Sequence, residues 1–518
     1  FQLATGVLAA RIAARASVGF AANLREDMYD NVQTFAFSNI DKFSTASIVT
    51  RLTTDTTNVQ NAFQMLMRMA IRAPVMLVFS MVVSFRISRD ISMTFLIILP
   101  ILALALFFII RSVFPVFTRV FRTYDELNNV VQENVRGIRV VKSFNQEQHE
   151  IGKFGAISAR IYKDFSKGER LITLNAPLMQ FCIYTCMIVI SWLGAKAIIA
   201  SGNDPALGLT TGNLTALITY TMQILSSLMM LSMVFAMLTI SLSSARRIAE
   251  VLEERSDIPQ PEQPVMTVRD GAVDFDHVSF VYASKADKKV LDDIDLHIRT
   301  GETIGIIGGT GASKSSLVQL IPRLYDVTGG KLTLGGVDVR DYDLDTLRGA
   351  VAMVLQKNEL FSGTIAENLR WGNENATDEE LQHACVLACA DEFISAMPDG
   401  YDTHIEQGGT NVSGGQKQRL CIARALLKKP KVLILDDSTS AVDTRTDAQI
   451  QQALSTYIPD TTKIIIAQRI SSVQNADRIV VLDDGRIDAV GCHDELLRTC
   501  EIYREVYESQ QKGGEDDA

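Results

Sequence analysis

The sequence predicts a protein of two parts: an all-α domain that crosses a membrane several times, followed by an α/β domain of the phosphate-loop type. Two observations lead to this prediction. Before about residue 250, the 518-residue chain contains several charge-poor apolar runs that are long enough to span a bilayer. After about residue 270 come short apolar strands and a glycine-rich loop between a strand and a helix. Residues 251–270 between the two parts contain three prolines and many charges, which predicts a linker.

The composition limits the possible partners. The formal net charge is -10 and no dense basic block occurs, so the sequence gives no indication of a nucleic acid partner. Seven cysteines are scattered through both parts, an odd number that favours reduced thiols over a disulfide framework. The chain begins with Phe1 inside an apolar stretch, which we interpret as a start partway through a membrane helix.

The clearest predicted span is the charge-free run Ile91–Ile110. Its 20 residues are enough to cross a hydrocarbon core of roughly 30 Å. Pro100 lies within this run and is tolerated in a membrane helix. Further spans are predicted at residues 64–85, 171–200 and 214–242. Buried helices in a large soluble core are the alternative, which the presence of several such runs together disfavours.

The loops between the spans predict the orientation. Residues 201–213 contain no lysine or arginine, whereas two long segments, at about residues 17–63 and 111–170, are rich in both. By the positive-inside rule the long segments are cytoplasmic, and the last span delivers the second part to the cytoplasm. Residues 124–154 carry apolar side chains at three- and four-residue intervals, so we expect long helices below the membrane. The membrane domain is therefore predicted at residues 1–250 and the α/β domain at 271–518.

A candidate phosphate-binding loop lies at the start of the α/β domain. The buried strand Thr303–Ile307 leads into the loop, and an apolar-periodic helix is expected at residues 316–324. Backbone N–H groups of such a loop bind phosphates, while Lys314 supplies a positive charge and Ser315 a hydroxyl for Mg²⁺. An ordinary glycine-rich turn is the alternative. The loop residues predicted to contact ATP are Gly308, Gly309, Thr310, Gly311, Ala312, Ser313, Lys314, Ser315 and Ser316.

Two further motifs follow in the order and spacing of a nucleotide site. The apolar strand Val432–Leu435 ends at Asp436, which is placed to hold the metal or its water. Between this strand and the loop, the sequence Ser413-Gly414-Gly415-Gln416 opens a helix and offers a second phosphate-binding surface. Together the three motifs resemble the nucleotide-binding domain of the ATP-binding cassette (ABC) transporters.

The resemblance extends over essentially the whole chain. The membrane half is similar to that of the exporters in which one half-transporter polypeptide has six spans followed by its cassette. The chain would match from the end of the second span, without the first span and most of the second. The resemblance implies a cell-membrane location, contact with lipid, a second half-transporter as partner, and ATP with Mg²⁺ as cofactors.

The resemblance also implies roles for single residues. Tyr282 would stack on adenine, and Gln356 would meet Mg²⁺ together with Ser315 and Asp436. Family cassettes close head-to-tail, so Ser413, Gly414, Gly415 and Gln416 would serve the ATP held by the partner. Residues 440–443 match the loop that crosses between two cassettes, and short helices near 39–47 and 144–152 would dock onto cassettes.

Three positions depart from the family pattern. Ser313 replaces a glycine, Asp437 replaces a glutamate thought to polarise the attacking water, and Gln468 replaces a histidine. Asp437 is shorter by one methylene, and a misplacement of about 1 Å can cost on the order of a hundredfold in rate. Gln468 donates a hydrogen bond but carries no positive charge. Asp437 and Gln468 are thus candidate catalytic residues in an altered form.

These departures predict the degenerate-site subunit of a heterodimeric exporter of the multidrug type. Its own ATP site would be weak or non-hydrolytic, its signature would complete the partner's site, and its cargo would be a small amphipathic molecule. Two alternatives remain open. One is a homodimeric exporter with two weak sites, and the other is a nucleotide-gated regulatory membrane protein that binds ATP without transport.

Overall fold

The chain forms two compact units, each with its own interior. A computed structural model describes residues 2–205, 208–282, 289–437 and 442–515. The first unit, here called the membrane unit, comprises Phe1–Gln33 and Thr45–Glu253. The second, here called the cassette unit, comprises Thr34–Ser44 and Glu254–Ala518.

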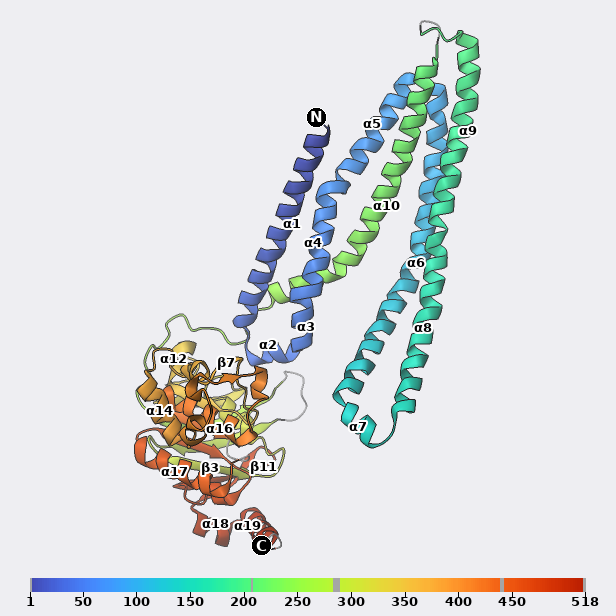
Figure 1. Cartoon of the computed structure of the whole chain (residues 1–518). Coiled ribbons are helices and arrows are strands. Elements are labelled where there is room, and N and C mark those ends of the chain that lie inside the picture. Colours follow the sequence, from blue (N-terminus) through green and yellow to red (C-terminus); the bar gives the residue numbers. More distant parts are fainter. Residues whose placement is uncertain (1, 206–207, 283–288, 438–441, 516–518) are drawn as a thin grey trace. The chain divides into compact units, whose positions relative to one another are not determined.

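The membrane unit is entirely helical in its described part (Figure 1). Its helices are α1 (Gln2–Gln33), α3 (Thr45–Thr50), η1 (Arg51–Asp55), α4 (Thr56–Met65), η2 (Leu66–Ala70), α5 (Arg72–Ile87), α6 (Arg89–Arg136), α7 (Ile138–Ser143), α8 (Glu147–Thr173), α9 (Asn175–Ser201) and α10 (Thr211–Glu253). The segments of the described chain that are long and apolar enough to cross a membrane number five: Leu3–Gln33, Thr45–Ile87, Arg89–Arg136, Glu147–Ser201 and Thr211–Phe235. The helices predicted over residues 124–154 are present, since α6 extends to Arg136, α7 follows it, and α8 begins at Glu147.

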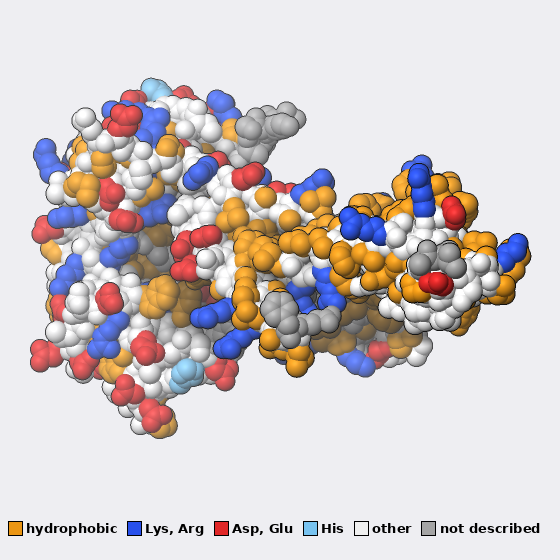
Figure 2. Space-filling model, turned by 90° about the horizontal axis from the view of Figure 1, so that it is seen from above, with side chains coloured by type: hydrophobic (Ala, Val, Ile, Leu, Met, Phe, Trp, Pro, Cys, Tyr) orange, Lys and Arg blue, Asp and Glu red, His pale blue; other side chains and the backbone are white. Residues whose placement is uncertain are grey.

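The surface of the membrane unit indicates which medium surrounds its helices. Large apolar side chains remain exposed on its helices, for example Ile97 at 64% and Ile199 at 82%. Figure 2 shows such side chains gathered over these helices. Because a water-soluble surface does not expose this much contiguous apolar area, the helices face lipid. The inner faces pack a separate core around Phe95, Leu102 and Ile190.

The cassette unit is built on a six-stranded sheet in the order β12-β11-β3-β10-β9-β6, in which only β12 is antiparallel to its neighbour. A second, antiparallel sheet has the order β2-β1-β4-β5, and β7 pairs with β8. The strands are β1 (Val273–Phe280), β2 (Leu291–Ile298), β3 (Thr303–Gly308), β4 (Gly329–Leu334), β5 (Val337–Asp338), β6 (Val351–Val354), β7 (Gly363–Thr364), β8 (His404–Ile405), β9 (Val432–Asp436), β10 (Thr462–Ile466), β11 (Arg478–Asp483) and β12 (Arg486–Gly491).

Both faces of the six-stranded sheet are buried, as in other mainly parallel sheets. Successive side chains of β9 point to opposite faces. Leu433 and Leu435 join the core that includes helix α16, whereas Val432 and Ile434 join the core shared with the antiparallel sheet. The helices of this unit are α2 (Phe37–Lys42), α11 (Lys314–Gln319), α12 (Leu344–Ala350), α13 (Ile365–Arg370), α14 (Asp378–Leu387), α15 (Asp391–Ser395), η3 (Gly400–Asp402), η4 (Gln407–Gly409), α16 (Gly414–Leu427), α17 (Thr444–Tyr457), η5 (Ile470–Ser472), α18 (His493–Thr499) and α19 (Glu501–Glu515).

The structure corrects the predicted end of one helix and shows to which unit another helix belongs. The helix expected at residues 316–324 begins at Lys314 and ends at Gln319, so its predicted end was wrong. Pro322 explains the early end, because proline lacks an N–H and disfavours helical geometry in the residue before it. Helix α2 belongs to the cassette unit, where the Asn39 side chain donates hydrogen bonds of 2.9 Å to the Glu254 carboxylate and the Arg255 carbonyl.

Candidate functional site

The candidate phosphate loop lies at the carboxyl edge of the six-stranded sheet. Strand β3 lies between β11 and β10, and β9 follows β10 in the sheet. All four strands are parallel, so the loop after β3 and the residues after β9 and β10 emerge at the same edge. Lys314 extends back over the loop, and its ammonium donates to the carbonyls of Gly308 and Gly309 at 2.7 and 2.9 Å. The topology therefore brings together motifs that lie more than a hundred residues apart in sequence.

A group of oxygen ligands lies beside this lysine. Asp436, 3% exposed, ends β9, and the Ser315 hydroxyl lies close enough to influence its carboxylate. Burial raises the pKa of Asp436, and the neighbouring Asp437 raises it further, while Ser315 and Lys314 act in the opposite direction. Burial lowers the pKa of Lys314, against the attraction of both aspartates. A hydroxyl next to buried, mutually repelling carboxylates suits a hard divalent cation such as Mg²⁺.

Asp437 is held by two glutamine side chains. Gln468 donates from Nε2 to Asp437 Oδ2 at 2.6 Å, and Gln356 donates to the same oxygen at 3.2 Å. Asp437 is 8% exposed, whereas both glutamines are exposed at the end of their strands. Two of the three positions that depart from the family pattern are thus hydrogen-bonded to each other.

The third such position, Ser313, has a left-handed backbone. Its φ is 68° and its ψ 21°, a conformation that glycine adopts freely and that costs an L-residue with a Cβ about 1–2 kcal/mol. The loop glycine Gly311 also has a positive φ, of 87°. A glycine at position 313 would remove this strain, which the sequence pattern alone does not reveal.

Tyr282 lies beside the start of α11. Its hydroxyl shares a hydrogen bond of 2.7 Å with the Ser316 hydroxyl, and its ring is 42% exposed. The ring of Tyr325 meets it edge-on with centroids 5.0 Å apart, and the Tyr325 hydroxyl donates to Asp41 of α2 at 3.0 Å. The exposed Tyr282 ring next to the phosphate loop is suitably placed to stack on a base.

The Ser413–Gln416 segment forms a well-built helix start away from the loop. The Ser413 hydroxyl accepts from the Gln416 amide at 3.3 Å, and the Gln416 side chain accepts from the Ser413 amide at 2.9 Å. This reciprocal capping box begins α16 and leaves Ser413 and Gly414 exposed. Within the described chain, no hydrogen bond joins Ser413–Gln416 to the loop Gly308–Ser316.

Comparison with known proteins decides the family. The model of the ABC transporter transmembrane region matches residues 1–242, and the ABC transporter model matches residues 291–440. The chain is 36% identical over 509 residues to YfiB of Bacillus subtilis, an uncharacterized ABC transporter ATP-binding protein, with 98% of this chain and 87% of YfiB covered. It is also 35% identical to the uncharacterized Rv1273c of Mycobacterium tuberculosis, over 98% of this chain and 87% of that one. The chain belongs to the ABC transporter family.

The structural comparison gives the type of transporter. A bacterial Atm1-family ABC exporter solved with ATP bound superposes with a TM-score of 0.84 at 25% identity, over 96% of this chain and 86% of that one. The predicted fold class is confirmed: a helical transmembrane domain is followed by an α/β ATP-binding cassette. The transporter is a multi-pass membrane protein with a cytoplasmic ATP-binding domain, and it is an ATPase-coupled exporter. ABC exporters work as dimers.

Two residues that support the site, Gln510 and Tyr325, were not predicted from the sequence. Gln510 of α19 donates to the Gln468 carbonyl at 2.7 Å and accepts from the Ile470 amide at 2.9 Å, so it holds the segment that carries Gln468. Tyr325 supports Tyr282 as described above. Neither residue belongs to a motif, and only the folded chain places them there. Of the predicted crossing loop 440–443, Ser440 and Ala441 lie outside the described residues, while Asp443 caps α17 by accepting from the Thr446 amide at 2.9 Å.

Proposed function

We propose that this chain is the degenerate-site subunit of a heterodimeric ABC exporter, whose partner is a second, non-identical half-transporter. The observation that most supports this proposal is the hydrogen bond of 2.6 Å between Gln468 and Asp437. A base must accept a proton from water, yet the short carboxylate of Asp437 accepts from two neutral amides at one oxygen. The chain's own ATP would therefore be bound but hydrolysed slowly.

ATP binding at this site would use the residues predicted from the sequence. The loop Gly308–Ser316 would bind the phosphates and Tyr282 the adenine. Ser315, Asp436 and Gln356 would hold Mg²⁺, which when bound neutralises phosphate charge. Lys314 would move from the loop carbonyls to the phosphates, because its ammonium forms stronger hydrogen bonds with an anion than with a neutral carbonyl.

The second site would be built on the partner. There the Ser413–Gln416 segment of this chain, exposed at Ser413 and Gly414, would face the partner's phosphate loop. Hydrolysis would drive the spans from an inward-facing to an outward-facing arrangement. The exported cargo would be a small amphipathic molecule. The capping box supports this assignment, because it fixes the segment without help from Ser313, Asp437 or Gln468.

Steady-state ATP hydrolysis by the purified complex and by this chain alone tests the proposal. In the complex, Gly414→Asp should reduce turnover by at least about tenfold, because it places a negative charge and a side chain against the partner's phosphates. Asp437→Asn should have a much smaller effect. Turnover by this chain alone comparable to that of the complex would refute the proposal, as would equal losses in the two variants.

A further inference from the structure

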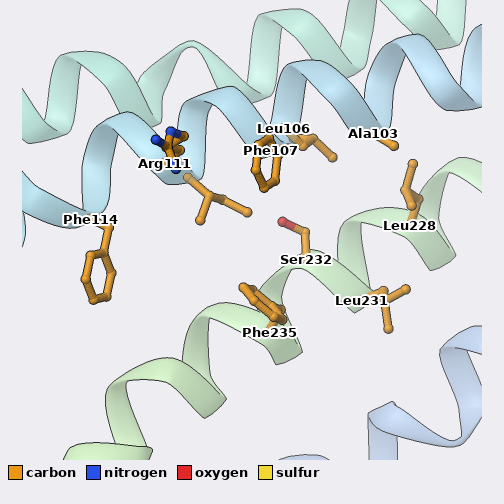
Figure 3. A pocket seen from close by; sticks show the side chains of 10 residues that line it. Ala103, Leu106, Phe107, Arg111, Phe114, Leu228, Leu231, Ser232 and Phe235 are labelled. Carbon is orange, nitrogen blue, oxygen red and sulfur yellow. The ribbon is translucent and has the colours of Figure 1, made fainter.

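The membrane unit contains a cavity between α6 and α10. Its volume is about 700 Å³, which is within the range of roughly 300–1,000 Å³ typical of small-molecule sites. The wall from α6 includes Phe107, Arg111 and Phe114, and that from α10 includes Leu228 and Phe235. Figure 3 shows the two helices facing each other, with Phe107 of α6 and Ser232 of α10 directed into the space between them and Arg111 seen against the α6 ribbon.

The lining residues follow helical spacing on both walls. On α6 they recur at intervals of three and four residues from Ala103 to Phe114, and on α10 they do so from Leu228 to Phe235. Each set therefore forms one continuous face of its helix. The two helices diverge from the end where each begins (Figure 1). The cavity lies between the two lining faces.

The depth of the cavity follows from helix geometry. Helix α6 begins at Arg89 and α10 at Thr211, both at the end opposite to the long cytoplasmic segments. With a rise of 1.5 Å per residue, Arg111 lies about 33 Å along α6 and Leu228 about 26 Å along α10. A bilayer core of about 30 Å places Arg111 at its cytoplasmic boundary, with Ala103 and Leu228 deeper in the hydrocarbon.

The cavity is thus apolar at its deep end and carries one cation, Arg111, towards its cytoplasmic end, where Phe114 and Phe235 also line it. Among its lining residues Arg111 is the one charged side chain, and Ser232 supplies the one hydroxyl. Among the residues that the structure describes, no carboxylate forms a salt bridge with Arg111, whereas Arg119 on the same helix pairs with Asp164 at 3.3 Å. A guanidinium at the membrane boundary interacts strongly with a carboxylate or phosphate, to which it donates two parallel hydrogen bonds.

We propose that this cavity is the cargo site and that it takes a single-chain anionic amphipath from the cytoplasmic leaflet. Arg111 binds the oxyanion headgroup, and the tail lies between the apolar faces towards Ala103 and Leu228. The inference rests on the proposed function, because it names the cargo class of the same exporter. Arg111 determines specificity here: it distinguishes an anionic amphipath from a neutral one of equal length.

Binding of dansylaminoundecanoic acid and of its methyl ester tests the proposal. Both are titrated by fluorescence into the full-length transporter complex in phosphatidylcholine nanodiscs, a lipid without net charge. The acid should bind about tenfold more tightly than the ester, because only the acid forms a charge-assisted pair with Arg111. Arg111→Gln should remove this difference and leave ester binding unchanged, and Arg111→Lys should restore most of it.

Two further variants separate the cavity from general effects. Arg122 is an exposed arginine about three turns further along α6 and outside the cavity lining, so Arg122→Gln should leave both affinities unchanged. Ser232→Phe fills the space between the helices and should weaken both probes. Equal affinity of acid and ester for the parent protein would overturn the proposal. So would equal losses in Arg111→Gln and Arg122→Gln, which would show a general surface-charge effect.

ATP-dependent uptake of the acid into inverted vesicles separates this inference from the proposed function. Uptake that falls at least about fivefold in Arg111→Gln supports the inference, since an affinity loss near tenfold reduces occupancy at low probe concentration. Unchanged uptake of the acid by this variant would overturn the inference while the two-site ATPase proposal stands. Conversely, ATP turnover by this chain alone that equals turnover by the complex would refute the heterodimer proposal. Acid binding that depends on Arg111 would still support the cargo site.

Discussion

Replacing Asp437 by glutamate and Gln468 by histidine, singly and together, tests which residue limits the rate of ATP hydrolysis at the chain's own site. Glutamate adds one methylene, which extends the carboxylate by about 1.5 Å towards the reacting atoms. A misplacement near 1 Å costs on the order of a hundredfold in rate, equivalent to about 2.7 kcal/mol. Both changes together should therefore raise hydrolysis at this site by about a hundredfold.

The single changes should recover less, because the two side chains are in direct contact. In Asp437→Glu the Gln468 amide can still donate to the carboxylate, as it does at 2.6 Å in the parent chain. A hydrogen bond to a charged group contributes about 1.5–3 kcal/mol, so we expect this variant to gain only about tenfold. Gln468→His alone should gain little, since the short carboxylate remains. The resulting coupling between the two changes is about 1.4 kcal/mol.

The assay is phosphate release by the complex in which the partner's own catalytic glutamate is replaced by glutamine, so that turnover reports this site. Titration with a fluorescent ATP analogue checks that affinity is unchanged. No gain in the double variant would refute the argument that the missing base limits hydrolysis, and it would identify Ser313 as the limiting residue. Strictly additive gains would refute the argument that Gln468 restrains Asp437.

Three further changes have separate expected outcomes. Ser313→Gly removes a left-handed strain of about 1–2 kcal/mol, partly offset by the freedom of glycine in the unfolded chain, so the free energy of unfolding should rise by up to about 1 kcal/mol; an unchanged unfolding temperature would contradict this. Asp436→Asn should raise the unfolding temperature of the nucleotide-free protein at neutral pH. The pKa of Asp436 is raised in the folded state, so its ionised carboxylate destabilises the fold, and this destabilisation disappears as the pH falls through that pKa. The difference in unfolding temperature between variant and parent should therefore shrink as the pH falls, and a difference that widens on acidification would contradict this reasoning. The variant should also lose the stabilisation that Mg²⁺ with ATP gives the parent protein. Gln510→Ala removes two hydrogen bonds worth about 0.5–1.5 kcal/mol each, so the Ile470 amide should exchange its hydrogen up to about tenfold faster, without the same change at β9; equal exchange in both proteins would show that α19 does not restrain the Gln468 segment.

Several features of the fold could be predicted because they depend on short-range patterns. Spanning helices follow from apolar length, and the predicted run 91–110 lies within α6. The predicted strand at residues 303–307 is present and extends one residue further, to Gly308. It could be predicted because the strand pattern and the phosphate-loop pattern are adjacent in sequence. The end of α11 was wrong because apolar periodicity was followed past Pro322, although proline outweighs periodicity there.

Other features depend on which distant segments the fold brings together. The hydrogen bond between Gln468 and Asp437 requires β10 and β9 to be neighbours, a pairing that the motifs do not state. Gln510 follows Gln468 by 42 residues and carries no motif, so only the docking of α19 reveals its role. The positive φ of Ser313 depends on the path of the whole loop, and the sequence indicates only that a glycine is missing.

The distribution of the altered residues is itself an argument for two unequal sites. Gln468 and Asp437 share a hydrogen bond, and Asp437 also interacts with Lys314 of the phosphate loop that contains Ser313. Changes at these positions therefore act on one ATP, the chain's own. The Ser413–Gln416 capping box uses none of these residues, and its helix packs in the other core of the cassette. Gly414 and Gly415 of the signature are both intact, and Gly414 is exposed at the start of this helix. Their presence beside an altered loop is what a signature serving a second, competent ATP site requires.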